Sequence, residues 1–196
     1  MYTALKDKIK DINANDTSQV YKPYIEFVSE SHPKRNRPTS TSLSQRKPLC
    51  TGLLHEAGGW EIIVDGVTNY SFPSDIAITI QRPDICIFSR SRRRVVLLEL
   101  TVPIEDRVVD AATLKTRRYQ DLSHDIASNN WKCDFFSVEV GSRGNDASSL
   151  GRCLTSLGFT RRERQELQRT VCDTARKASY FIYLKRNDAT WTLPAR

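Results

Sequence analysis

Residues 82–101 read RPDICIFSRSRRRVVLLELT, and they decide the fold of this chain of 196 residues. They predict two strands, 85–88 and 95–102, joined by a short basic turn. The second strand is apolar on both faces, which is typical of a central strand covered on both sides. One face carries Val96, Leu98, Leu100 and Val102, and the other carries Val95 and Leu97. Glu99 interrupts the second face, and because an unpaired buried carboxylate is costly, we expect a cation beside it.

Asp84 follows Pro83 at the head of the first strand. If the two strands form a hairpin, Asp84 and Glu99 lie on adjacent strands with their side chains on the same face. Paired carboxylates of this kind form a site for a hard cation, typically Mg²⁺ or Mn²⁺. The stretch therefore predicts a metal site as well as the centre of a sheet.

Composition indicates a soluble globular protein with one sizeable domain and an extension, because 39% of the residues are hydrophobic and 27% are charged. The longest apolar runs are strand-sized, so we expect no membrane span. Residues 1–20 are polar and charged, without the pattern of a signal peptide, so we expect an intracellular protein. The five cysteines contain no C-x-x-C pair, which favours reduced thiols over a zinc cluster.

The net charge of +7 favours a polyanionic partner, with nucleic acid ahead of a membrane surface. A basic soluble protein without such a partner is the alternative.

Four regions are predicted along the chain. Residues 1–28 form a helical or extended extension, with a short charged helix over 1–13 and an apolar piece over 20–28. Residues 29–50 form a basic linker rich in Ser and Pro. Its cluster of Lys34, Arg35 and Arg37 would contact phosphate, act as a nuclear import signal, or remain a solvated tail. Residues 51–146 form the compact domain, and residues 147–196 form a helical extension that packs on it.

Within the compact domain, strands are predicted at 60–64, 76–80 and 131–140, and a helix at 105–128. A single stripe of this helix faces the core at spacings of three and four residues, and it consists of Val108, Ala112, Lys115, Tyr119, Leu122 and Ile126. Lys115 and Tyr119 stand where apolar residues are expected. A snorkelling lysine and a half-buried tyrosine are one explanation. The alternative explanation is that Lys115 and Tyr119 form a site together with Glu99, and the need of Glu99 for a cation favours it.

A C-terminal helical pair is predicted after the glycine-rich turn at 139–144. The first helix, 147–157, stops at Gly158. The second begins at Thr160, whose spacing to Glu163 is that of a capping box, and runs towards residue 184. A DNA-reading helix-turn-helix and a simple packing pair both fit this arrangement, and packing pairs are the commoner of the two.

The order of strand, strand with Asp84, basic turn, strand with Glu99, helix and strand resembles the PD-(D/E)XK nuclease superfamily over residues 60–140. The resemblance implies an α/β, restriction-endonuclease-like core, with a central mixed β-sheet flanked by helices. It also implies that Asp84, Glu99 and the backbone carbonyl of Leu100 hold one or two divalent ions. The family places a lysine two residues beyond the Glu, and this chain departs from that pattern with Thr101.

Lys115 and Tyr119 resemble the Q-x-x-x-Y motif of helicase-associated exonucleases in the same superfamily. Over residues 52–190 the chain also resembles a region near the C-terminus of reverse-transcriptase-bearing retroelement proteins of animals. The matching segments are Arg82–Ile85, Leu98–Pro103, Glu105–Arg107, Lys115–Tyr119, Val138–Gly144 and Ala178–Ile182. This resemblance is more specific than the carboxylate pair alone.

The resemblance implies a metal-dependent DNA endonuclease or nickase, with Mg²⁺ or Mn²⁺ as cofactor. Asp84 and Glu99 would be metal ligands, Lys115 would stabilise charge, and Tyr119 would position the site. Asp75 would supply a third carboxylate or cap a turn, and Glu61 is a weaker candidate. Many relatives of this fold cut duplexes as dimers, so a homodimer is a further expectation.

DNA contacts are expected from Arg90, Arg92, Arg93, Arg94, Arg117, Arg118 and Arg143. Contacts of this kind give affinity and salt dependence, not sequence specificity. A solvated hairpin tip is the alternative for the first four.

Two readings compete with an active nuclease. One is an inactive nuclease-fold module that binds nucleic acid or a protein, which Thr101 favours. The other is a structural domain in which Glu99 and Lys115 form a buried ion pair. An apolar residue at position 99 would be cheaper in a purely structural core, which favours the active enzyme.

Overall fold

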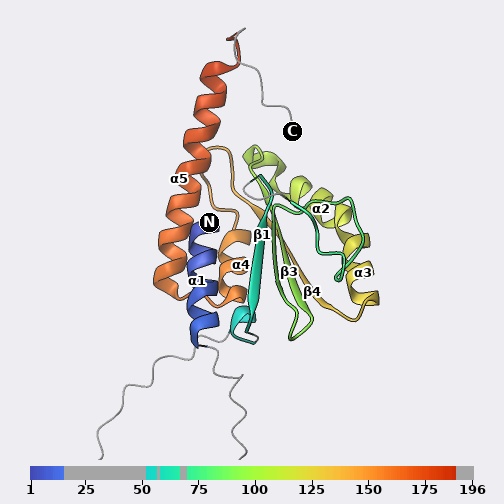
Figure 1. The fold of residues 1–196 in the computed structure, drawn as a ribbon. Coiled ribbons are helices and arrows are strands. Elements are labelled where there is room, and N and C mark those ends of the chain that lie inside the picture. The colour runs from blue at the N-terminus through green and yellow to red at the C-terminus, as the bar shows by residue number, and fades with distance from the viewer. Residues whose placement is uncertain (16–51, 57, 67–69, 189–196) are drawn as a thin grey trace, which may run out of the picture.

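A computed structural model describes residues 1–15, 52–56, 58–66 and 70–188. It is a mixed α/β fold in which helices cover both faces of a four-stranded sheet (Figure 1). The predicted apolar piece at 20–28, the linker at 29–50 and its basic cluster lie outside the described residues. Among the described residues, no helix has the length and apolar character needed to cross a membrane.

The sheet is mixed and keeps its strands in chain order. The strands are β1 (Trp60–Val64), β2 (Ile85–Ser89), β3 (Arg94–Thr101) and β4 (Lys132–Glu139). β2 runs antiparallel to both of its neighbours, and β4 runs parallel to β3. The hairpin predicted from residues 82–101 is confirmed, with Ile85 opposite Leu98.

β3 is the central strand, buried on both faces from Arg94 to Glu99. Val96 and Leu98 pack into one core, and Val95 and Leu97 pack into the other. The predicted burial of Leu100 and Val102 is wrong, because both are exposed. The paired part of β2 ends opposite Leu98, so the end of β3 runs past its neighbour.

One face of the sheet is covered by a short 3₁₀ turn (Glu105–Arg107), α2 (Val108–Arg118) and α3 (Gln120–Ser128). The prediction of one continuous helix over 105–128 is wrong, because the chain leaves the helical conformation at Tyr119, with φ of −97° and ψ of 4°. The ring of Tyr119 packs against Phe135 of β4, with centroids 5.4 Å apart. The break is therefore accompanied by burial of an aromatic ring against the sheet.

The predicted strand at 76–80 is also wrong. The amides of Ile76 and Ala77 both donate to the carbonyl of Pro73, at 3.0 and 3.2 Å, which closes a turn in place of a strand ladder. Ile76 and Ala77 reach the core, whereas Ile78 and Ile80 are 92% and 98% exposed. Alternating hydrophobicity here reflects a turn that buries only its first half.

The other face is covered by α1 (Tyr2–Asn15), α4 (Ser149–Leu157) and α5 (Arg161–Lys185). A short 3₁₀ helix, Leu53–Glu56, precedes β1. The helix predicted over 1–13 is confirmed, and its Leu5 and Ile9 share one core with residues of α4. The predicted capping box is confirmed too, because the Thr160 hydroxyl accepts from the amide of Glu163, whose carboxylate accepts from the amide of Thr160.

Candidate functional site

Asp84 and Glu99 lie opposite each other where β2 begins. The register that pairs Ile85 with Leu98 brings them together, one residue beyond that pair. The amide of Asp84 donates to Glu99 Oε2 at 3.3 Å, and the amide of Leu100 donates to Asp84 Oδ2 at 2.7 Å. Side chains alternate along a strand, so both carboxylates lie on the face that α2 and α3 cover. Two acidic side chains therefore share one edge of the core.

Lys115 is the cation expected beside Glu99. Its ammonium group on α2 donates to Glu99 Oε1, and the Glu99 side chain is 4% exposed against 26% for Lys115. Tyr119 is buried, and its hydroxyl donates to the carbonyl of Arg82 at 3.0 Å. Helix α2 and the break after it thus add a cation and a phenol to the two carboxylates.

The electrostatics of the site follow from burial. Burial raises the pKa of Asp84, the hydrogen bond from the Leu100 amide opposes that shift, and the neighbouring Glu99 carboxylate adds to it. Burial also raises the pKa of Tyr119, and Glu99 raises it further. Tyr119 is therefore a neutral phenol at pH 7, suited to hydrogen bonding and not to proton abstraction.

The donor atoms at this edge suit a hard cation. Asp84 and Glu99 supply carboxylate oxygens. The Leu100 amide points towards Asp84, and because the amide and carbonyl of one strand residue face the same side, its carbonyl faces that way too. Mg²⁺ commonly takes one or two carboxylates and completes its shell with water and substrate phosphate. Within the described part of the chain, no three His, Cys, Asp or Glu side chains gather as a metal cluster.

Asp75 and Glu61 are not part of this edge. Both carboxylates bind the guanidinium of Arg90, which lies over the ring of Phe88. Phe88 is four residues along β2 from Asp84, a distance of about 13 Å. The expectation that Asp75 joins Asp84 as a third carboxylate is therefore corrected, because its charge is neutralised elsewhere.

The arginines of the β2–β3 turn divide into two groups. Arg94 is buried and pairs with Glu56 and Asp134, so its predicted contact with DNA phosphate is wrong. Arg90 is committed to the two carboxylates described above. Arg92 and Arg93 are exposed, but Arg94 already lies five residues from Glu99, or about 17 Å along the strand. The turn stands at the far end of the hairpin from Asp84.

Two arginines of α2 and one before β2 lie nearer the carboxylates, whereas Arg143 lies beside Glu105. Arg117 and Arg118 are exposed on the last turn of α2, the turn that also carries Lys115. Arg143 is exposed and 3.8 Å from Glu105. Sequence reasoning missed Arg82, which is exposed, two residues before Asp84, and paired with Asp65 at 2.6 Å. Its place beside the Pro-Asp pair was the available signal.

A second polar pair on the same sheet face was also missed. Glu139 of β4 is buried and lies in register with Thr101, and the Ser137 hydroxyl bonds its carboxylate. The buried hydroxyl of Thr101 has no hydrogen-bond partner among the described residues. Alternation along β4, with Ser137 and Glu139 following Cys133 and Phe135 on one face, was the signal for these residues.

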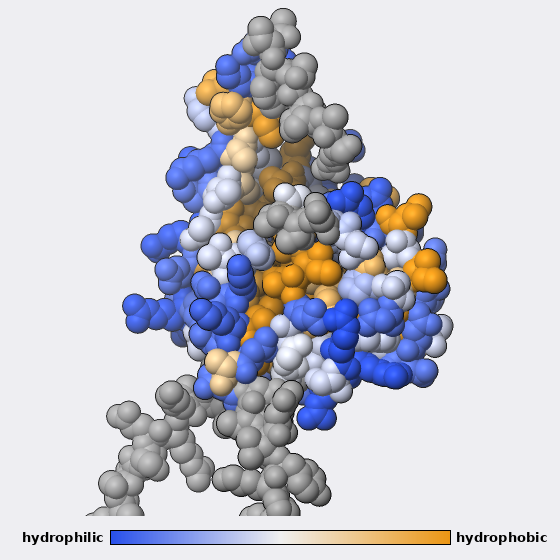
Figure 2. All heavy atoms as spheres, in the orientation of Figure 1, coloured by the Kyte–Doolittle hydropathy of each residue, from blue (hydrophilic) through white to orange (hydrophobic). Residues whose placement is uncertain are grey.

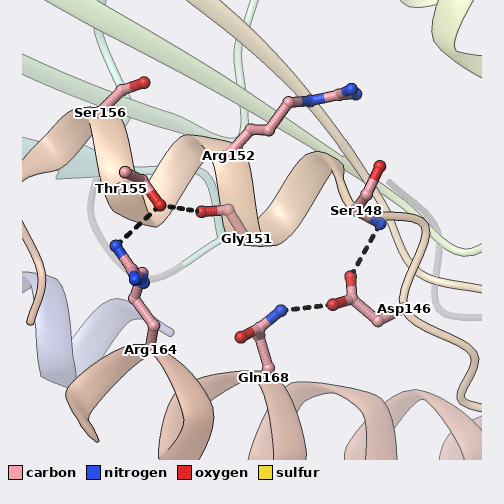
Figure 3. A pocket seen from close by; sticks show the side chains of 8 residues that line it. All are labelled: Asp146, Ser148, Gly151, Arg152, Thr155, Ser156, Arg164 and Gln168. Atoms are coloured by element: carbon pink, nitrogen blue, oxygen red, sulfur yellow. Dashed lines mark hydrogen bonds between the residues drawn. The ribbon is translucent and has the colours of Figure 1, made fainter. Parts of the chain in front are cut away.

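Helices α4 and α5 pack against each other around a polar hollow of about 580 Å³ (Figure 3). Arg164 donates to the Thr155 hydroxyl at 2.9 Å, and Gln168 donates to Asp146. The first turn of α5 is also held by α1, since Lys8 pairs with Glu163 at 3.2 Å. These contacts favour a packing pair over a helix-turn-helix, because the start of α5 is used within the fold.

The four described cysteines are free thiols. Burial raises the pKa of Cys86 and Cys153, so neither is a ready nucleophile.

No protein-family model and no curated protein matches the chain. The arrangement of Asp84, Glu99, Lys115 and Tyr119 is therefore what bears on function.

Proposed function

We propose that this protein is a metal-dependent nuclease that hydrolyses phosphodiester bonds in DNA. One observation carries the proposal: Asp84 and Glu99 lie opposite each other on one sheet face, and Lys115 reaches Glu99 from α2. The resemblance to PD-(D/E)XK nucleases and to the retroelement region supports it. The chain also has the order of elements on which these resemblances were based: three strands, a helical segment and a fourth strand.

Asp84, Glu99 and the carbonyl of Leu100 would hold the Mg²⁺ or Mn²⁺ ion. A bound ion of this kind polarises the scissile phosphate and lowers the pKa of a coordinated water. Lys115 would place its ammonium group beside the phosphate, where negative charge develops. Lys115 keeps one donor on Glu99 and has two further N–H groups to offer.

Tyr119 would position the site and not transfer a proton. Its hydroxyl holds the carbonyl of Arg82, two residues before Asp84, and so fixes the approach of the chain to that carboxylate. Arg117 and Arg118 would bind neighbouring phosphates from the same helix turn, without reading sequence.

Thr101 replaces the lysine of the resembling family, and in this proposal Lys115 supplies the missing positive charge from α2. A hydroxyl at position 101 can accept or donate a hydrogen bond but carries no charge. The cation is thus relocated from β3 to the helix that packs over it.

An inactive nuclease-fold module that binds nucleic acid is the second candidate. The observation that favours it is the contact between Glu99 and Lys115, which neutralises Glu99 from within the chain. In that case the ion pair would be structural, and DNA binding would persist without cleavage.

Cleavage of supercoiled plasmid with Mg²⁺ or Mn²⁺ separates these candidates. The matched set is wild type, Asp84→Asn, Glu99→Gln and the control Asp75→Asn, which changes a carboxylate of the same segment that does not reach the site. We expect nicking by wild type and Asp75→Asn, and none by the other two or with EDTA. Cleavage by Asp84→Asn would overturn the proposal, and salt-sensitive binding without cleavage by any form would establish the second candidate.

A further inference from the structure

Glu139 is a buried carboxylate that the proposed chemistry leaves unused. It is 3% exposed, and among the described residues its carboxylate has one hydrogen-bond donor, the Ser137 hydroxyl, and no ion pair. A buried carboxylate held by a single hydroxyl is costly, so a cation beside Glu139 would stabilise it. The residue in register with it on β3 is Thr101, whose buried hydroxyl has no partner in the described part of the chain.

Glu139 and Glu99 are neighbours on the sheet face that α2 covers. Ser137 lies in register with Glu99, and Glu139 follows two residues further along β4. Strands lie about 4.8 Å apart and advance about 3.3 Å per residue, so the Cα atoms of Glu99 and Glu139 are about 8 Å apart. The hydrogen bond from Ser137 also draws the Glu139 carboxylate back towards the position opposite Glu99.

Lys115 is the cation that α2 turns towards this face. Arg117 and Arg118, the other two cations of α2, are exposed, and Figure 2 shows mostly hydrophilic side chains over this side of the molecule. The ammonium group of Lys115 donates one N–H to Glu99 and has two more to offer. One of these can serve a second carboxylate beside Glu99.

We infer that Glu139 is a positioning residue that accepts a second hydrogen bond from Lys115 when a divalent ion occupies the site of Asp84 and Glu99. The formal charges favour this role. Three ionised carboxylates and one ammonium group sum to −2, which one divalent ion cancels. Glu99 then shares its charge with the ion, and like charges close together repel, so its hold on Lys115 weakens. Glu139 keeps the ammonium group at the site and leaves its third N–H for the phosphate.

Because this role begins with an occupied metal site, it rests on the proposed function. A double-mutant cycle on metal affinity tests it without relying on cleavage. Isothermal titration of Mn²⁺ into the full chain, without DNA, gives the Kd of wild type, Glu139→Gln, Lys115→Met and the double variant. We expect Glu139→Gln to weaken Mn²⁺ binding about tenfold, the worth of roughly one charged hydrogen bond, because Lys115 then competes with the ion for Glu99.

The sign of the coupling separates this role from a direct effect on the ion. In the presence of Lys115→Met, the change Glu139→Gln should weaken Mn²⁺ binding by about threefold or less, since no ammonium group remains to be held. A direct electrostatic effect of Glu139 on the ion would act at least as strongly without Lys115. Glu61→Gln is the matched control, the same change at a strand carboxylate that pairs with Arg90, and should leave the Kd unchanged.

Ser137→Ala gives a second test that keeps the buried carboxylate. It removes the hydroxyl that directs Glu139 towards Glu99, and it should weaken Mn²⁺ binding roughly threefold, again only when Lys115 is present. Thermal denaturation without metal checks that each variant is folded. Equal or greater weakening by Glu139→Gln in the presence of Lys115→Met would overturn this role alone. Absence of Mn²⁺ binding by wild type would overturn the proposed function together with it.

Discussion

Lys115 on α2 donates a hydrogen bond to Glu99 on β3, across a separation of 16 residues in sequence. The contact joins a surface helix to the central strand and places both charges where the Glu99 side chain is almost fully buried. A well-packed apolar pair of similar volume is often at least as stable as a buried ion pair. A structural role alone therefore gives little reason for these two residues, whereas a cation site gives one.

Removal of Lys115 should cost more stability than removal of Glu99. Lys115→Met leaves a buried carboxylate without its cation and should lower the free energy of unfolding by about 2–3 kcal/mol, since Lys115 itself is partly exposed. Glu99→Gln should cost about 1 kcal/mol, because the freed ammonium group can turn to water. Urea denaturation at pH 7 measures both. Equal losses from the two variants would contradict the buried pair, and Lys132→Met, at an exposed lysine, is the control.

Divalent metal should stabilise the fold through Asp84, whether or not the protein cleaves DNA. At an Mg²⁺ concentration about ten times the Kd, binding adds about 1.4 kcal/mol to the free energy of unfolding. That gain corresponds to a rise in Tm of about 3–6 °C. Thermal denaturation with Mg²⁺ and with EDTA should show the rise in wild type and in Asp75→Asn, and not in Asp84→Asn. A rise that persists in Asp84→Asn would place the ion elsewhere.

The pH dependence of stability should report the burial of Asp84. In the folded protein the pKa of Asp84 lies above its ordinary value of 3.8, so the folded state holds the proton more tightly than the unfolded state. The contribution of Asp84 is then most favourable below about pH 4 and is lost as the pH rises through its folded pKa. Asp84→Asn without metal should therefore have a higher Tm than wild type at pH 7. This difference should vanish below about pH 4, and a difference that is constant across pH would contradict the assignment.

DNA affinity should depend on the arginines of α2 more than on those of the β2–β3 turn. Arg117→Ala with Arg118→Ala removes two cations beside Lys115 and should flatten the dependence of log K on log salt by about 1.8, if each contacts one phosphate. Arg92→Ala with Arg93→Ala is the matched pair at the far end of the hairpin and should change the slope much less. Fluorescence anisotropy across a salt series measures both, and the reverse ranking would place the DNA at the turn.

Local patterns in the sequence were enough for several features. The two apolar runs joined by a basic turn in residues 82–101 specified the β2–β3 hairpin, and with it the pairing of Asp84 with Glu99, because both strands and their turn lie within one short stretch. The capping box at Thr160 was equally readable, since its partners are three residues apart. The need of Glu99 for a cation followed from burial alone.

Other features were set by contacts between distant parts of the chain. Arg94 looked like a turn arginine, but β4 and the segment before β1 bring Asp134 and Glu56 to it. The helix expected to run through Tyr119 is broken there, where the Tyr119 ring meets Phe135 of β4. The sequence around Arg94 does not reveal its carboxylate partners, and the sequence around Tyr119 does not reveal Phe135, because these partners lie in distant segments.

The sequence by itself determined that a central strand carries a buried carboxylate opposite a second one, because strand periodicity and hairpin pairing are local. The core-facing stripe of the helix also pointed to Lys115 as the cation that meets Glu99. Only the tertiary structure decided that Asp75 is held by Arg90, away from Asp84, and that Arg94 is held by Asp134 and Glu56. The physical reason is that ion pairs form between whichever side chains packing brings together. Packing of α2 and of the segment before β2 onto the sheet depends on the whole core.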